Sequence, residues 1–68
     1  MDKLKLEYEM KTRGVSVAEM CENLHISRTT FYRKCNGFSE FTLREIQGIV
    51  DYLNLETPVG IFFAANVS

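Results

Sequence analysis

The chain has 68 residues, of which 46% are hydrophobic and 25% charged, and its formal net charge at pH 7 is −1. A chain of this length forms one small domain at most and buries only about 60% of the surface that it exposes when unfolded. A small-molecule cleft of roughly 300–1,000 Å³ would leave too little core around it, so we expect no enzyme, no small-molecule substrate and no cofactor. The composition is that of a folded globular protein.

The sequence carries no sign of a membrane segment or of secretion. No apolar run approaches the ~18 residues that a membrane span needs, and residues 1–11 lack the apolar stretch of a signal peptide. Cys21 and Cys35 form no CxxC pair, which favours free thiols in a reducing cytoplasm. With His25 they make three potential metal ligands, but a closed zinc site needs four, so we interpret both cysteines as small core residues and expect no metal.

The segment before Gly14 gives a mixed signal. Leu4, Leu6, Tyr8 and Met10 alternate with charged residues, and a period of two by itself favours a strand. We nevertheless predict a helix, because the segment is rich in helix formers, Gly14 is a natural C-terminal stop, and a lone strand would have no partner.

Three later helix starts share one pattern: an apolar residue, a hydroxyl that can cap the helix, and then an apolar helical period. In the first and third, a Glu three residues after the hydroxyl completes a capping box. The apolar residue before each hydroxyl has the spacing of a hydrophobic staple. The three starts are Val15-Ser16 with Glu19, Ile26-Ser27, and Phe41-Thr42 with Glu45.

Two helices are predicted in the C-terminal part. Over residues 43–53 the buried stripe is Leu43, Ile46, Val50 and Leu53. A further helix begins at Thr57-Pro58, where proline suits the first helical position, and runs to about Ala64.

The predicted fold is therefore all-α, a compact bundle of five helices that forms a single domain over residues 1–68. We expect Tyr8 and Tyr52 to be half-buried in its core. Residues 61–63, Ile-Phe-Phe, either pack in the core or form an exposed patch that another subunit covers. We expect residues 66–68 to be frayed.

Residues 16–37 have the spacing of a helix-turn-helix: a helix of about eight residues, a tight turn over residues 24–26 and a second capped helix. Their sequence is SVAEMCENLHISRTTFYRKCNG. It resembles the helix-turn-helix of the phage lambda-type repressor and Cro family, and ISRTTFYRKCNG is especially similar to small phage regulators of Gram-positive hosts. The resemblance implies a lambda repressor-like fold that binds double-stranded DNA as a homodimer on a pseudo-palindromic operator.

Several positions can be matched to this family. Cys21 takes its small-residue position, Phe31 its buried position in the recognition helix, and His25 the turn position that is usually glycine. Val17 departs from the glutamine that commonly contacts the DNA backbone. Lys34 stands where an apolar residue is frequent, so its stem is expected to fill part of the helix interface.

The second helix has one face for the core and one for DNA. At 100° per residue, Arg28, Thr29, Tyr32 and Arg33 fall within an arc of about 140°, and Phe31 and Cys35 lie outside it on the other side. Its cations also form a local basic patch, because no carboxylate lies between residues 24 and 39. We expect base contacts from Arg28, Thr29 and Tyr32, and backbone contacts from Ser27, Arg33, Lys34 and Asn36.

Other interpretations stay open. The outer face could be an ordinary solvated surface. Val17 and the net charge of −1 would also suit a helical protein-interaction module that keeps the fold without binding DNA, and an antitoxin or excision factor would use the same face. The leading hypothesis is a sequence-specific transcriptional regulator, phage or prophage derived, with no catalytic function. It would form a weak homodimer through its C-terminal helix.

Overall fold

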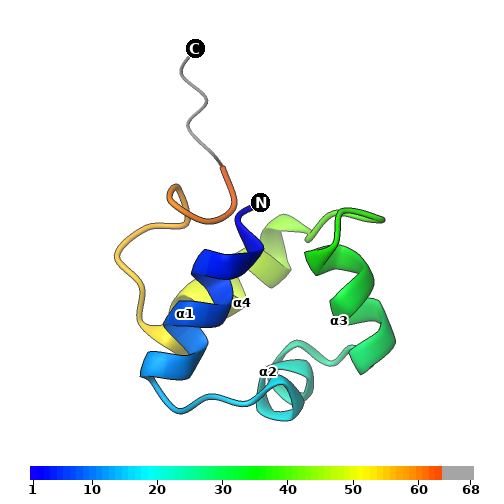
Figure 1. Cartoon of the computed structure of the whole chain (residues 1–68), viewed down its shortest axis with the longest axis horizontal. Coiled ribbons are helices and arrows are strands. Elements are labelled where there is room, and N and C mark those ends of the chain that lie inside the picture. Colours follow the sequence, from blue (N-terminus) through cyan, green and yellow to red (C-terminus); the bar gives the residue numbers. More distant parts are fainter. Residues whose placement is uncertain (64–68) are drawn as a thin grey trace.

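The computed structural model describes residues 1–63, which form four α-helices and no strand (Figure 1). The all-α prediction is confirmed, but the prediction of five helices is wrong. The helices are α1 (Lys3–Thr12), α2 (Val17–Leu24), α3 (Arg28–Cys35) and α4 (Leu43–Leu53). Both predicted capping boxes form, at Ser16 and at Thr42, and Ser27 caps α3.

All four helices also end in the same way. A residue with positive φ follows each helix, and the N–H of the next residue bonds back to a carbonyl of the last turn, which is the Schellman motif. The ambiguous first segment is a helix that stops at Gly14, as predicted. His25 adopts the left-handed conformation at the turn, with φ 59° and ψ 43°. The residues with positive φ are Gly14, His25, Gly37 and Asn54.

The core lies where the four helices meet, and α1 is seen in front of α4 in the view of Figure 1. Gly48 of α4 lets α2 approach closely, since a Cβ at this position would lie 3.1 Å from a methyl group of Leu24. Each helix contributes buried residues: Leu6 and Met10; Met20 and Cys21; Phe31 and Cys35; and Ile46, Ile49, Val50 and Leu53. Phe41 and Ile61 complete the core from outside the helices.

Some side-chain positions differ from the prediction. The alternation in α1 gives the helix two apolar faces, because Leu6 and Met10 point into the core while Leu4 and Tyr8 point outward. Tyr8 and Tyr52 are both exposed, so the prediction that they are half-buried is wrong. On α4 the buried stripe is correct from Ile46 onward and includes Ile49. Leu43 is 77% exposed, because the first residue of the helix lies beyond the edge of the core.

The predicted fifth helix is absent from the described residues. Residues 58–63 form turns, in which the carbonyl of Pro58 accepts from the N–H groups of Ile61 (3.2 Å) and Phe62 (2.8 Å). Gly60 and the β-branched residues on either side of it have low helix propensity, so the proline starts a single turn that does not propagate. The predicted end at Ala64 and the predicted fraying of residues 66–68 lie outside the described residues.

Residues 59–63 still pack onto the domain. The carbonyl of Ile61 accepts from the N–H of Asp2 at 2.7 Å, and the Ile61 side chain is only 3% exposed. The ring of Phe62 meets that of Phe41 edge to face, with centroids 5.6 Å apart. We call residues 59–63 the C-terminal strap.

Candidate nucleic-acid interface

Two buried side chains fix the orientation of α3. Phe31 and Cys35 lie one turn apart and both face the core. The ring of Phe31 also packs edge to face against Phe41, with centroids 5.9 Å apart, which ties α3 to the start of α4. Because this face is held, the opposite face of α3 is displayed to solvent.

The outer face carries the residues expected to contact bases. Arg28, Thr29 and Tyr32 are all exposed, as is Arg33 in the last turn. Within residues 24–39 there is no carboxylate to neutralise these cations locally. The division into a core face and a free face therefore follows the predicted periodicity.

The N-terminus of α3 is closed by its own cap. Ser27 Oγ accepts from the N–H of Thr30 (3.1 Å) and donates to Thr30 Oγ1 (2.9 Å). Since both functions of the hydroxyl are used inside the protein, a phosphate at this helix N-terminus would be met chiefly by backbone N–H groups. The Ser27 side chain is therefore a helix cap in the free protein.

Lys34 is placed differently from the other cations of α3. Its ammonium pairs with Glu45 Oε1 at 2.5 Å, and the two side chains are only 12% and 15% exposed. Burial alone would raise the pKa of Glu45, but the hydrogen bond from Lys34, together with the cap at Thr42, lowers it below its ordinary value. Lys34 thus joins the end of α3 to the start of α4, with its stem inside the interface as expected.

The C-terminal end of α3 brings together residues that are distant in sequence. Lys3 of α1 donates to Asn36 Oδ1 at 3.0 Å, so a second cation lies beside the predicted backbone contact at Asn36. The guanidinium of Arg33 lies over the ring of Phe38, with Cζ 5.6 Å from the ring centroid. Sequence reasoning missed Lys3 and Phe38. Lys3 could not have been found from sequence, because no spacing rule links it to Asn36. Phe38 could have been found, because it follows Asn36-Gly37, which is a typical helix ending.

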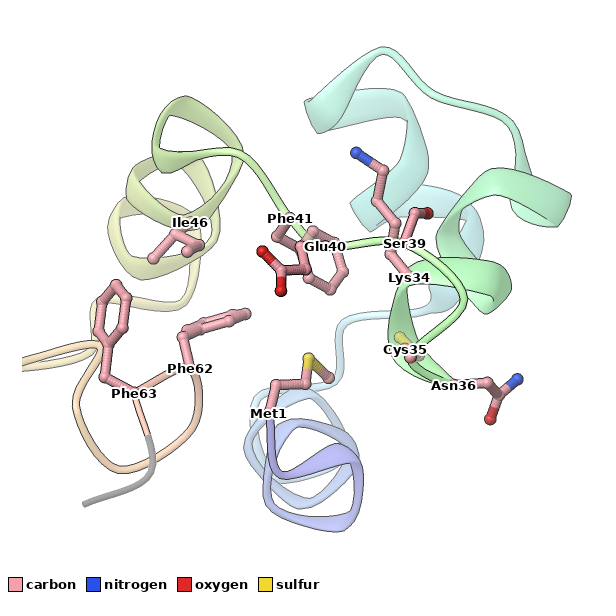
Figure 2. A pocket seen from close by; sticks show the side chains of 11 residues that line it. Met1, Lys34, Cys35, Asn36, Ser39, Glu40, Phe41, Ile46, Phe62 and Phe63 are labelled. Carbon is pink, nitrogen blue, oxygen red and sulfur yellow. The ribbon is translucent and has the colours of Figure 1, made fainter. Parts of the chain in front are cut away.

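A hollow of about 480 Å³ borders this end of α3 (Figure 2). Phe41 and Phe62 stand beside it, Met1 approaches from the segment that precedes α1, and the carboxylate of Glu40 points into it. A carboxylate repels phosphate, so the hollow does not extend the basic surface, which stops before Glu40.

The two cysteines are buried free thiols, as predicted. Burial raises the pKa of Cys35 to about 11, and it also raises that of Cys21, where the charge of Arg28 partly opposes it. Both thiols are therefore protonated near neutral pH. Residues 1–63 contain no cluster of three or more His, Cys, Asp or Glu side chains placed to hold a metal ion.

Comparison with known families identifies the fold. Residues 5–58 match the Cro/C1-type HTH DNA-binding domain. The chain belongs to this family. The predicted resemblance is confirmed, and the chain is a DNA-binding regulator of the helix-turn-helix type, with α2 and α3 as the two helices of the motif. No curated protein and no solved structure shows significant similarity to the chain.

The family match also sets limits within the chain. It ends at Pro58, so the C-terminal strap lies beyond it although Ile61 belongs to the core of this Cro/C1-type domain.

None of the helices in residues 1–63 has the length and apolar character required to cross a bilayer.

Proposed function

We propose that this Cro/C1-type domain is a sequence-specific transcriptional regulator that occupies a pseudo-palindromic operator, with α3 in the major groove of double-stranded DNA. We further propose that residues 1–68 are one domain, with its helix-turn-helix over residues 16–37. Its origin would be a phage or prophage, and its place of action the cytoplasm of the bacterial host, on DNA. No catalytic step is part of the proposal.

One observation carries the proposal: the outer face of α3 is cationic and exposed while its inner face is locked into the core. The guanidinium of Arg28, in the first turn, suits guanine O6 and N7. The methyl and hydroxyl groups of Thr29 suit thymine or phosphate, and Tyr32 can reach a phosphate or stack. This face therefore offers both base contacts and backbone contacts.

The two exposed arginines are assigned different work. Arg28 stands at the N-terminal end of α3, which enters the groove most deeply in this motif, so it contacts a base. Arg33 lies more than one turn later, where the helix leaves the groove, so it contacts phosphate. Ser27 and Asn36 are assigned to the backbone as well. Lys34 is the weakest of the proposed phosphate contacts, because its ammonium is paired with Glu45.

The test compares two alanine variants after an operator has been selected from a random duplex pool. Arg28→Ala should cost roughly 1–3 kcal/mol on the operator and relax the preference at one base pair per half-site, with little change on non-specific duplex. Arg33→Ala should weaken all duplexes about equally and reduce the salt slope by about one per subunit. Lys5→Ala removes an exposed cation beside the C-terminal strap and serves as the matched control.

Each outcome of this comparison decides something. If both variants weaken every sequence alike, Arg28 contacts the backbone and base recognition lies with Thr29, Tyr32 or DNA shape. If the wild-type chain binds no duplex even in 50 mM salt, the regulator hypothesis fails. The protein-interaction module, which the apolar Val17 also suits, would then replace it.

The proposal includes a weak homodimer through the C-terminal end, now on a smaller surface. Ile61 belongs to the core and Phe62 is half-buried, which leaves the exposed Phe63 and Met1 beside the hollow of Figure 2. Half-sites about one helical turn apart would follow from such a dimer. Sedimentation at high micromolar concentration, and on operator-length DNA, tests it, because a monomer under both conditions contradicts the dimer.

A further inference from the structure

The Schellman endings of the four helices share a backbone motif but not the same side chains. In this motif the residue after the left-handed one commonly packs against the residue five positions earlier. For α1, α2 and α4 both residues are apolar, and both belong to the core or pack against it. These pairs are Val15 with Met10, Ile26 with Cys21, and Leu55 with Val50, each joined by a backbone hydrogen bond.

The ending of α3 departs from this pattern. Its pair is Phe38 with Arg33, joined by a backbone hydrogen bond of 2.9 Å from the Phe38 N–H to the Arg33 carbonyl. Phe38 is 72% exposed and does not belong to the core cluster, unlike its three counterparts. Its ring instead lies beside the Arg33 guanidinium, 5.6 Å from Cζ to centroid. The Phe38 side chain therefore packs against an arginine instead of the core.

Such a contact matters for an arginine that binds an anion. A free arginine side chain samples many rotamers, and fixing it on a phosphate carries an entropic cost. A guanidinium over an aromatic face is held by the negative potential of the ring, and its N–H groups remain free at the edge to donate to oxygen. At the end of α3, Gly37 and the two backbone bonds of the Schellman motif fix the position of Phe38.

We propose that Phe38 is a positioning residue for Arg33: its ring holds the guanidinium at the C-terminal end of α3 before DNA arrives. The phosphate then meets an arginine whose direction is already set. This inference rests on the proposed role of Arg33 as a phosphate contact. Phe38 itself binds no DNA group and adds no charge.

The experiment is a double-mutant cycle on the full chain, measured as affinity for a non-specific duplex across a salt series. Phe38→Leu keeps an apolar residue in the Schellman ending and removes the ring. We expect affinity to fall about 2- to 5-fold, with an unchanged salt slope because the number of neutralised phosphates is unchanged. In an Arg33→Ala background, Phe38→Leu should have no effect. Phe38→Trp should restore affinity, since Trp is the strongest partner for a cation.

A spectroscopic signal tests the same contact without DNA. In the free protein, the Nε–H proton of Arg33 should show a ring-current shift that disappears in Phe38→Leu. Tyr8→Leu, which removes an exposed aromatic ring from α1, is the matched control and should change neither this signal nor DNA affinity.

The outcomes separate this inference from the proposed function. If the wild type binds duplex and Arg33→Ala weakens it, but Phe38→Leu has no effect, the positioning role is wrong and the regulator hypothesis stands. If the full loss from Phe38→Leu persists in the Arg33→Ala background, Phe38 contacts DNA directly and the positioning role is again wrong. If the wild type binds no duplex, the proposed function itself fails.

Discussion

The ammonium of Lys34 is bound to Glu45 in the free protein, so this residue contributes first to stability. Lys34→Met should lower the free energy of unfolding by roughly 1–3 kcal/mol, because the largely buried Glu45 carboxylate then loses its charged donor and keeps only the hydrogen bond from the Thr42 N–H. Arg33→Met, one residue earlier on the exposed face, should stay within about 0.5 kcal/mol of wild type. Urea unfolding of the two variants makes the comparison, and equal stabilities would contradict the structural role of Lys34.

The same pair sets a pH dependence. The folded pKa of Glu45 is lowered, so the stability that it contributes is present above the unfolded pKa and is lost as pH falls through the folded value. Melting temperatures measured from pH 7 down to pH 2 should therefore fall more steeply for wild type than for Lys34→Met. The two curves should converge at the acid end, where Glu45 is protonated in both chains.

The thiol of Cys35 should be unreactive in the native state. Its pKa of about 11 leaves very little thiolate at pH 8, and burial blocks access, so labelling by iodoacetamide should be slow until denaturant is added. Because the folded pKa of Cys35 is raised, the stability that this thiol contributes is fully present below its unfolded pKa near 9. That contribution is lost as pH rises through the folded pKa of about 11. Cys35→Ala should show a smaller loss over this range, which separates the thiol from the tyrosines and lysines that titrate there.

At the level of the helices, α3 depends on one aromatic anchor. Phe31→Ala should cost roughly 3–5 kcal/mol, enough to unfold much of so small a domain, because the Phe31 ring is buried and packs against Phe41. Tyr32→Ala, the adjacent exposed position, is the control and should keep most of the melting temperature. A Phe31→Ala chain with wild-type thermal stability would mean that the two faces of α3 are assigned the wrong way round.

The helices that the sequence predicts best are those whose signals are local. Ser16, Ser27 and Thr42 cap helices as expected, because each hydroxyl bonds to a backbone N–H within one turn and needs nothing from the rest of the fold. The turn over residues 24–26 follows from the helix-turn-helix spacing, and the family resemblance places His25 at its left-handed position. The helix predicted to begin at Pro58 does not form, because a proline suits the first position of a helix but does not favour its extension through Gly60.

The features that the sequence did not predict depend on tertiary contacts. The exposure of Leu43 follows from where the core ends, which periodicity along α4 does not contain. The pairing of Lys34 with Glu45 required the end of α3 to lie against the start of α4. In the candidate interface, the exposed face of α3 could be predicted from the helical period, whereas the free or paired state of each cation could not.

For the whole molecule, the C-terminal strap is part of the fold although it lies beyond the family match. Ile61→Ala should cost roughly 2–5 kcal/mol, because the side chain is 3% exposed, and DNA affinity should fall with it. Phe63→Ala, at a 46% exposed position, should change the melting temperature little. Calorimetry and duplex binding of both variants make the test, and equal stabilities would show that the strap is dispensable.

The C-terminal strap also affects the point in synthesis at which the domain can complete its fold. The N–H of Asp2 donates to the carbonyl of Ile61, so the start of α1 cannot make this bond until residues 59–63 have been synthesised. Translation proceeds at about 5–20 residues per second, and a nascent chain that has not yet released residues 59–63 lacks the Phe62 ring that braces Phe41 and, through it, Phe31. The recognition helix therefore gains part of its packing support only once residues 59–63 are free to fold back onto Asp2 and Phe41.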